Sequence, residues 1–540
     1  MKKKYVLVSV IALGLLISLL AGCGKTGVVP ESSSPSASVS GGDSSSVSSP
    51  VSTPQLNVAV ELFPVTLEPS TSWESWYVMR FGAGETLVRY GSGGEYQPWL
   101  AESWDVAEDN LTWTFKIRQG VKFSNGKDMT AKDIVASIER LFELEDPANG
   151  GNGNPQGHFT YSALTAKDDY TVVIVTEIPT PDIPGCLAYP WTLIMDVDGS
   201  AGRDVAAEGP ICTGPYAFSA FVQDSDAQMM RNEYYWAGEV PFEKVNIMKA
   251  AEASTRSMAL QDGSADMALN ISAADREVLS QSGDFIVNIV AGSRTGYAHI
   301  NMNGVMGNDK LRQAVMMAID GKTIADVTTS GSYTHGYAVI PSSLDFGYDE
   351  LTYEFNYDPA AAKQILDDAG IVDSDGDGYL EIDGKMINLD YKVTSNRQMD
   401  IIAQAQATQL ESIGIKCSVT ITENHAEILN NHLFDLSCSN EVVTPTGDPA
   451  KFLRHWYTPS DDNYAQYSNS EYDRLFEALS SEFDEETRRD YMIQLQQILL
   501  DDAAVLVYGY FNYNICTVDT LSGVNANPND FYWIVNDIRF

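Results

Sequence analysis

The chain has 540 residues, of which 44% are hydrophobic, and a formal net charge of −40 from 34 basic and 74 acidic residues. This length is too great for one hydrophobic core and predicts two or three globular domains. The acidic excess argues against nucleic acid as a partner, because phosphate contacts need clusters of Lys and Arg.

The first 22 residues have the pattern of a signal peptide. Three lysines, Lys2 to Lys4, precede an apolar run from Val6 to Leu20 that is short for a membrane-spanning helix. The run ends in Leu-Ala-Gly-Cys, which resembles a bacterial lipobox, so Cys23 is the expected lipidated first residue after cleavage. A plain signal peptide followed by an incidental Cys is the alternative.

A Ser-rich stretch follows Cys23, and residues 23–54 are therefore predicted to be a lipidated Cys and a flexible tether. One lipid group would anchor a folded domain without spanning the bilayer. We therefore expect an exported protein that is lipid-anchored on the outer face of the bacterial cytoplasmic membrane.

Five cysteines remain if Cys23 is lipidated, at positions 186, 212, 417, 438 and 516. An odd number cannot all pair, and no C-x-x-C spacing is present, so free buried thiols are expected. A Cys186–Cys212 or Cys417–Cys438 disulfide stays open as an alternative.

The predicted elements begin with a short strand at Leu56–Leu62. Apolar and polar residues alternate from Leu111 to Arg118, which predicts a half-buried strand. After an Asn125-Gly126 turn, Thr130 with Asp133 three residues on predicts a capped helix. Residues 143–165 predict a loop. Further along we expect strands at Tyr170–Val175, Ile415–Ile421 and Val505–Tyr508. We expect helices at Asp309–Ile319, at Asp358–Gly370 and at 484–500, and another that begins at a Ser470 cap.

One stretch, Pro98 to Ile134, carries motifs at fixed spacing: P-x-LA-x-SW, then T-W-x-F-x-I-R-x-G-V-x-F-x-N-G, then T-A-x-D-I. It resembles the signature of the family 5 extracellular solute-binding proteins, the peptide- and nickel-binding subunits of ABC importers. Thr213-Gly-Pro-Tyr216 and Arg312-Gln-Ala314 match further family motifs, and the similarity runs from about residue 55 to 513.

The resemblance implies an α/β, two-lobed periplasmic-binding-protein-like fold with an extra inserted domain and a ligand cleft between the lobes. The implied parts are lobe one (55–80, 210–300 and 505–540), the inserted domain (81–209) and lobe two (301–504). We expect the crossing strands near Tyr297–Asn303 and Val505–Tyr513.

The implied function is that of a membrane-anchored, monomeric substrate-binding subunit that captures peptides or peptide-like solutes and delivers them to the ABC permease and ATPase subunits. Family peptide binders place an Asp four residues before the Pro of a D-P-x-x-F segment, where it pairs with the peptide amine. Here Asp448-Pro449 is preceded by Pro445 at that position. This departure keeps nickel or a metal chelate open as an alternative cargo.

An enzyme is not expected, because the chain has no G-x-S-x-G elbow and no H-E-x-x-H helix. A secreted hydrolase remains a remote alternative, and no cofactor is implied. The expected ligand-binding residues are Asn440, Glu441, Thr444 and Thr446 in lobe two, with Glu441 as a substitute for the missing Asp, and Glu61 and Phe63 in lobe one.

The segment Asp373 to Gly378 resembles a calcium loop. Its twelfth position is Gly384, where such a loop needs a bidentate Glu. An Asp/Gly-rich turn is therefore expected, and no metal site is predicted.

Overall fold

The computed structural model describes residues 54–91, 93–153, 158–524 and 526–540, which belong to one compact unit. The predicted signal peptide, Cys23 and almost all of the tether lie outside these residues. In the described ranges no helix combines the length and the apolar character needed to cross a membrane.

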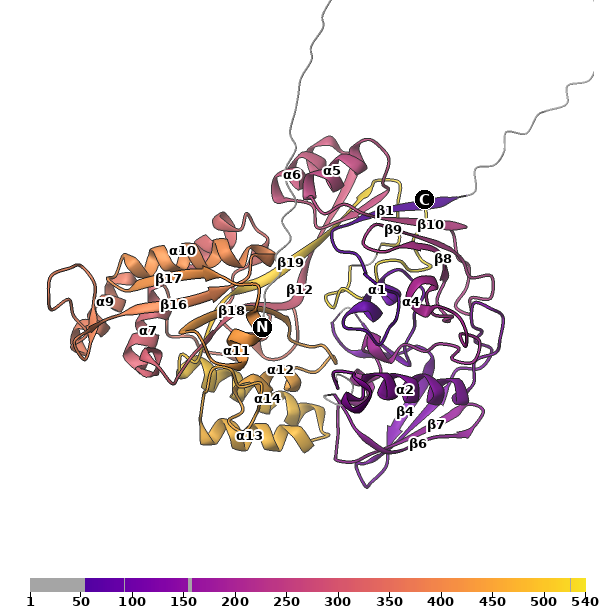
Figure 1. Cartoon of the computed structure of the whole chain (residues 1–540), viewed down its shortest axis with the longest axis horizontal. Helices are drawn as coiled ribbons and strands as arrows, with labels where there is room; N and C mark the ends of the chain where they lie inside the picture. Colours follow the sequence, from indigo (N-terminus) through magenta and orange to yellow (C-terminus); the bar gives the residue numbers. More distant parts are fainter. Residues whose placement is uncertain (1–53, 92, 154–157, 525) are drawn as a thin grey trace, which may run out of the picture. The chain divides into compact units, whose positions relative to one another are not determined.

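An eleven-stranded mixed sheet has two long antiparallel strands at its centre, β12 (Phe285–Ile300) and β19 (Val505–Val518) (Figure 1). On one side follow β18 (Leu436–Val442), β16 (Asn388–Val393) and β17 (Lys416–Ile421), here called the second half. On the other side lie β11 (Met267–Leu269), β1 (Gln55–Val60), β10 (Lys244–Lys249), β9 (Asp226–Arg231) and β8 (Tyr216–Val222), here called the first half. The short β13 (Tyr333–Thr334) also pairs with β19.

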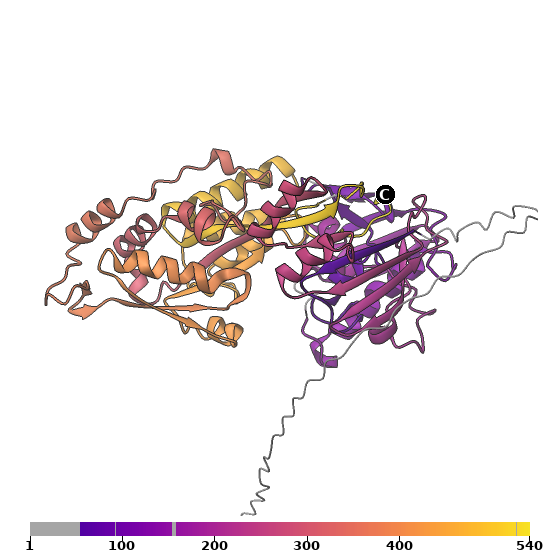
Figure 2. The same ribbon diagram turned by 90° about the horizontal axis from the view of Figure 1, so that it is seen from above.

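The two central strands pass from one half of the sheet to the other (Figure 2). Their ladder is interrupted between Ala291 and Thr295, and beyond this break β12 also pairs with β18, from Arg294–Val442 to Ile300–Leu436. β12 therefore reaches the second half at Arg294, earlier than the expected 297–303. β19 begins at Val505 as expected but continues well past Tyr513.

Helices cover both faces of the second half. One core combines residues of β12 and β16–β18 with α7 (Asp309–Ala318), α9 (Pro359–Asp368) and α10 (Met399–Glu411). Another combines Tyr297 and Val505 with α12 (Ala450–Leu453), α13 (Ser470–Ser481) and α14 (Glu485–Asp501). In the first half α5 (Ala253–Gln261) and α6 (Ala273–Ser282) pack near β11.

A separate four-stranded antiparallel sheet packs with helix α2 (Ala131–Glu145) and contains the motif-bearing stretch (Figure 1). Its strands, in spatial order, are β4 (Ala101–Val106), β5 (Thr112–Ile117), β7 (Thr171–Thr176) and β6 (Tyr161–Asp168). Thr130 and Asp133 form the predicted capping box. The predicted loop at 143–165 is too long, because α2 continues to Glu145 and β6 starts at Tyr161.

The remaining described α-helices and strands are short: α1 (Glu74–Arg80), β2 (Val88–Tyr90), β3 (Tyr96–Pro98), α3 (Ile183–Cys186), α4 (Val205–Glu208), α8 (Gly321–Thr323), β14 (Glu381–Ile382), β15 (Lys385–Met386) and α11 (His425–Asn430). The predicted cap at Ser470 is wrong, since Asn469 accepts hydrogen bonds from the backbone N–H groups of Glu471 and Tyr472. The five described cysteines are free and buried. The exact limits of lobes and inserted domain stay a prediction.

Candidate functional site

Polar residues of β12, β13 and β18 join in a hydrogen-bonded chain where β12 enters the second half. The guanidinium Nη1 of Arg294 donates to the backbone oxygen of Asn440 at 2.7 Å. The amide nitrogen of Asn440 donates to the Tyr333 hydroxyl at 2.9 Å, and that hydroxyl donates to the backbone oxygen of Arg397 at 2.8 Å. Two arginines from distant segments are thereby held near one strand.

A third arginine, Arg80 at the end of α1, approaches from the N-terminal part of the chain. It donates to the Asp530 carboxylate at 2.6 Å and to the backbone oxygen of Asp530 at 2.8 Å. The nearby segment is fixed to β12, because the backbone N–H of Ser293 donates to Pro528 at 3.1 Å. We call Arg80, Arg294, Arg397, Asn440 and Asp530 the crossing cluster.

The charges of the crossing cluster interact. Burial and the positive charges of Arg397 and Arg80 together lower the pKa of Arg294 to about 9, while the negative charges of Asp530 and Glu441 oppose the shift. Arg80 is paired with Asp530, but neither Arg294 nor Arg397 forms an ion pair with any described residue. Within the described part of the chain, the cluster thus has two arginines without a counter-ion.

Glu441 is already engaged by protein groups. Its carboxylate accepts a hydrogen bond from the Tyr297 hydroxyl at 2.8 Å and pairs with the Nε2 atom of His455 at 3.1 Å. Burial opposes ionisation, but His455 and Tyr297 hold the pKa of Glu441 at about 2, and Glu441 in turn raises the pKa of His455. The Glu441 side chain is 39% exposed.

Asn440 and Glu441 are adjacent in β18, so their side chains point to opposite faces of the sheet. Asn440 shares its face with Arg294, whereas Glu441 shares its face with Tyr297, as the β12–β18 register requires. The Oδ1 atom of Asn440 is buried without a hydrogen-bond partner. The structure therefore separates two predicted site residues and assigns only Asn440 to the crossing cluster.

Thr444 and Thr446 lie in a loop that contacts three other segments. Both are buried; Thr444 donates to Asn529 at 3.3 Å and Thr446 donates to Asp182 at 3.1 Å. The hydroxyls of two tyrosines, Tyr90 and Tyr96, donate to the backbone oxygens of residues 445 and 446 at 2.9 and 2.8 Å. These threonines hold the loop in place here, and a ligand contact for them stays a prediction.

The two ligand-binding residues predicted in the first half, Glu61 and Phe63, form none of the hydrogen bonds described for the crossing cluster. Glu61 accepts a hydrogen bond from the Asn270 amide at 3.0 Å and is half-buried. Phe63 is a core residue in this structure: it is 6% exposed, and its ring centroid lies 5.5 Å from that of Phe81 and 6.2 Å from that of Phe221. Their roles in ligand binding also stay a prediction.

Sequence reasoning missed the three arginines and Tyr333. None of them belongs to a recognisable motif, and each of the three arginines is more than a hundred residues from the next along the chain. The available signal was the position of Arg294, which lies three residues before the expected crossing strand at Tyr297–Asn303. That position is where residues from both halves can meet.

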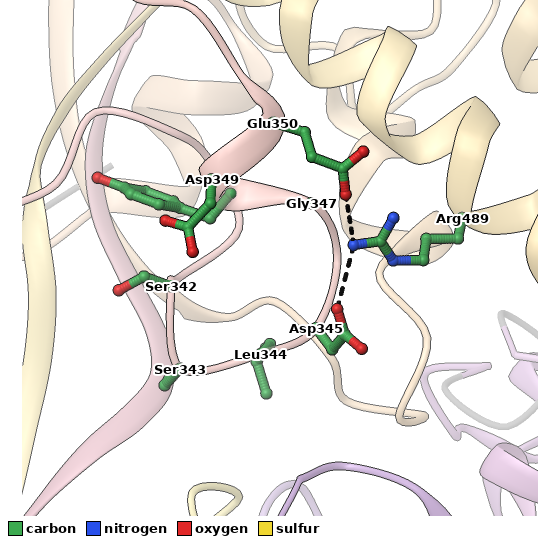
Figure 3. Close-up of a pocket in the computed structure, with 9 residues that line it drawn as sticks. Ser342, Ser343, Leu344, Asp345, Gly347, Asp349, Glu350 and Arg489 are labelled. Atoms are coloured by element: carbon green, nitrogen blue, oxygen red, sulfur yellow. Dashed lines mark hydrogen bonds and ion pairs between the residues drawn. The ribbon is translucent and has the colours of Figure 1, made fainter.

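A surface pocket of about 360 Å³ lies elsewhere, beside α14 (Figure 3). Its Arg489 points between Asp345 and Glu350 and pairs with them at 3.1 and 2.7 Å. A second pocket, of about 230 Å³, is lined by residues such as Trp99 and Tyr532. Neither pocket is lined by a predicted ligand-binding residue.

The Asp-rich loop brings four carboxylates together. Oxygen atoms of Asp373, Asp375, Asp377 and Glu381 lie within 4.8 Å of one another. Oxygen ligands at this spacing could hold a divalent cation. Counted from Asp373, Glu381 is the ninth residue of the loop. It therefore does not occupy the twelfth position, where a calcium loop has its bidentate Glu and this chain has Gly384.

A sheet divided into two halves by two crossing strands, with polar residues gathered at the crossing, is an arrangement that suits a ligand-binding protein. Residues 95–464 match the family model described as bacterial extracellular solute-binding proteins, family 5 (Middle). The chain belongs to this family of solute-binding proteins, which confirms both the resemblance found in the sequence and the expectation of a non-catalytic protein.

Three similar proteins each align with most of this chain. The dipeptide-binding protein DppE of Bacillus subtilis is 24% identical over 499 residues, which are 86% of this chain and 88% of that protein. The structure of NikA from Brucella suis with Fe(III)-EDTA is similar with a TM-score of 0.79 at 20% identity, covering 90% of this chain and 99% of NikA. AppA of Bacillus subtilis with a nonapeptide gives a TM-score of 0.73 at 22% identity, covering 90% and 98%. These structures confirm the α/β fold.

Proposed function

We propose that this chain is the membrane-anchored substrate-binding subunit of an ABC importer and captures peptides or peptide-like solutes for the permease and its ATPase subunits. The observation that carries the proposal is the crossing of β12 and β19, the only two strands of the described sheet that connect its halves. Two parts linked in this way can close around a ligand by bending at few residues. The names of DppE and AppA support a peptide-class solute.

The test is to purify residues 24–540, release small molecules by denaturation and identify them by mass spectrometry. A bound solute in about one-to-one amount, returned unchanged after incubation with the refolded protein, supports the proposal. Conversion of the solute into products would refute it. A change in the radius of gyration on adding the solute, measured by small-angle X-ray scattering, would show closure directly.

The lipid anchor has its own experiment. The lipobox predicts that Cys23 carries the lipid, so the full-length chain should incorporate a labelled fatty acid and remain with the membrane fraction. Cys23→Ala should abolish both the labelling and the membrane association. Labelling that survives this substitution would refute the proposed anchor.

A second cargo, nickel or a metal chelate, is favoured by one observation. Pro445 cannot pair with a peptide amine, and Glu441 already pairs with His455. The name of the similar NikA structure with Fe(III)-EDTA supports this candidate. Elemental analysis of the purified protein, before and after adding a chelated metal, distinguishes it from a peptide binder.

A further inference from the structure

The crossing cluster has an excess of positive charge in a strongly acidic protein. Arg294 and Arg397 have no ion-pair partner among the described residues, although the chain has 74 acidic and only 34 basic residues. Their side chains are half-buried, so water screens their repulsion less than on an open surface. Unpaired like charges held close together are unfavourable, and such arrangements gather at functional sites.

The protein holds these arginines in fixed places. The backbone around Arg397 is anchored by the Tyr333 hydroxyl, and its guanidinium lies 5.9 Å from the ring centroid of Phe511 in β19. Arg294 is fixed through Asn440. Of the five guanidinium N–H groups of Arg294, one donates a hydrogen bond to a described protein atom, the backbone oxygen of Asn440. The guanidinium of Arg397 donates none to the described residues. The remaining donors suit planar anions, which Arg binds in a bidentate manner.

The two described carboxylates that could recognise a free amine near the crossing cluster are already paired. Asp530 is neutralised by Arg80 at 2.6 Å. Glu441 lies on the opposite face of β18 and is paired with His455. Pro445 occupies the position at which the family's peptide binders are expected to have a carboxylate. The crossing cluster therefore offers positively charged hydrogen-bond donors, whereas its one carboxylate, that of Asp530, is already paired.

We infer that the crossing cluster binds its solute through at least two carboxylate groups, one at Arg294 and one at Arg397, and selects polycarboxylates over neutral peptides. This inference rests on the proposed function and narrows its solute class. The shared chemistry fits two sources, a highly acidic peptide or a metal chelated by a polycarboxylate. Pairing each arginine with a carboxylate would offset the repulsion between the two guanidinium groups. Ligand binding would therefore favour the conformation in which Arg294 and Arg397 lie close together.

Calorimetric titration of refolded residues 24–540 tests the inference with four probes: metal-free citrate, nickel citrate, triglutamate and trialanine. We expect the best polycarboxylate to bind at least about tenfold more tightly than trialanine, because each charge-assisted hydrogen bond contributes more than a neutral one. Preference for triglutamate identifies a peptide source, and preference for nickel citrate over citrate identifies a chelate.

Substitutions locate the binding groups. Arg294→Gln and Arg397→Gln should each weaken polycarboxylate binding by about tenfold or more, while the Lys variants should retain part of the affinity. Arg474→Gln is the charge-matched control, since Arg474 is 60% exposed and pairs with Glu471 on the surface of α13. Pro445→Asp should strengthen trialanine binding and leave the arginine sites in place. Circular dichroism checks that each variant folds.

The inference is overturned if trialanine binds as tightly as every polycarboxylate, or if neither glutamine variant differs from Arg474→Gln. It is also overturned if none of the probes binds while denaturation releases a neutral solute. That last result would leave the proposed solute-binding function intact, so the two failures can be told apart.

Discussion

The buried ion pair between Asp448 and Arg488 fixes the loop that precedes α12, and its removal should be among the most damaging single changes. Arg488 donates two hydrogen bonds to the Asp448 carboxylate, at 2.5 and 3.2 Å, and two more to backbone oxygens of residues 479 and 482 at 2.7 and 2.8 Å. The two side chains are only 9% and 11% exposed. The other Asp448 oxygen accepts from the N–H of Ala450 at 2.7 Å.

Arg488→Met leaves a buried carboxylate and two backbone oxygens without their donor. Breaking a buried pair by removing one partner typically costs about 3–5 kcal/mol. The next residue provides a control, because Arg489 is 32% exposed and pairs with carboxylates that are 92% and 56% exposed. Such surface pairs contribute about 0–1 kcal/mol, so Arg489→Met should change stability little.

Urea denaturation of residues 24–540, followed by tryptophan fluorescence, measures both variants. The double variant Asp448→Asn/Arg488→Met should lose less than the two single losses added together, because no charge remains buried alone. Equal losses for Arg488→Met and Arg489→Met, or strict additivity in the double variant, would refute the reasoning.

Two further predictions concern the neighbouring segments. Glu441→Gln should lower the pKa of His455, as measured by NMR of the imidazole signals. The ion pair should stabilise the fold most between about pH 4.5 and 6.5. This stabilisation is lost as pH falls towards the depressed pKa of Glu441, about 2, and as pH rises through the raised pKa of His455. An unchanged imidazole titration would contradict the ion pair. Gly185→Ala would place a Cβ atom 1.7 Å from the backbone oxygen of Thr446, so it should lower the melting temperature, whereas Gly304→Ala, whose Cβ would meet nothing closer than 3.4 Å, should not.

Elements with strong local signals could be predicted from the sequence. The Thr130 capping box and the alternation in β5 depend on residues within a few positions of one another, and both are confirmed. The length of β19 could not be predicted in this way, because its later residues include polar Asn512 and Asn514 and are ordered by pairing with β12, more than two hundred residues earlier. Long-range pairing overrides local composition there.

The candidate site was predicted only in part for the same reason. Its arginines come from α1, from β12 and from the turn before α10, and no spacing in the sequence connects them. The opposite orientation of Asn440 and Glu441 follows from strand alternation, but only once residues 436–442 are known to form β18. The sequence therefore indicated Asn440, which belongs to the crossing cluster, but not the face of β18 on which the cluster gathers.

The unpaired cysteines have a practical consequence. All five in the described part are buried, and burial raises the pKa of their thiols, to about 12 at Cys417, Cys438 and Cys516. Thiols of this kind react slowly with alkylating dyes, because the thiolate is the reactive form. A single cysteine introduced on each half of the sheet would therefore accept a fluorophore almost alone, and the distance between two such dyes could report solute capture in real time without removing any native residue.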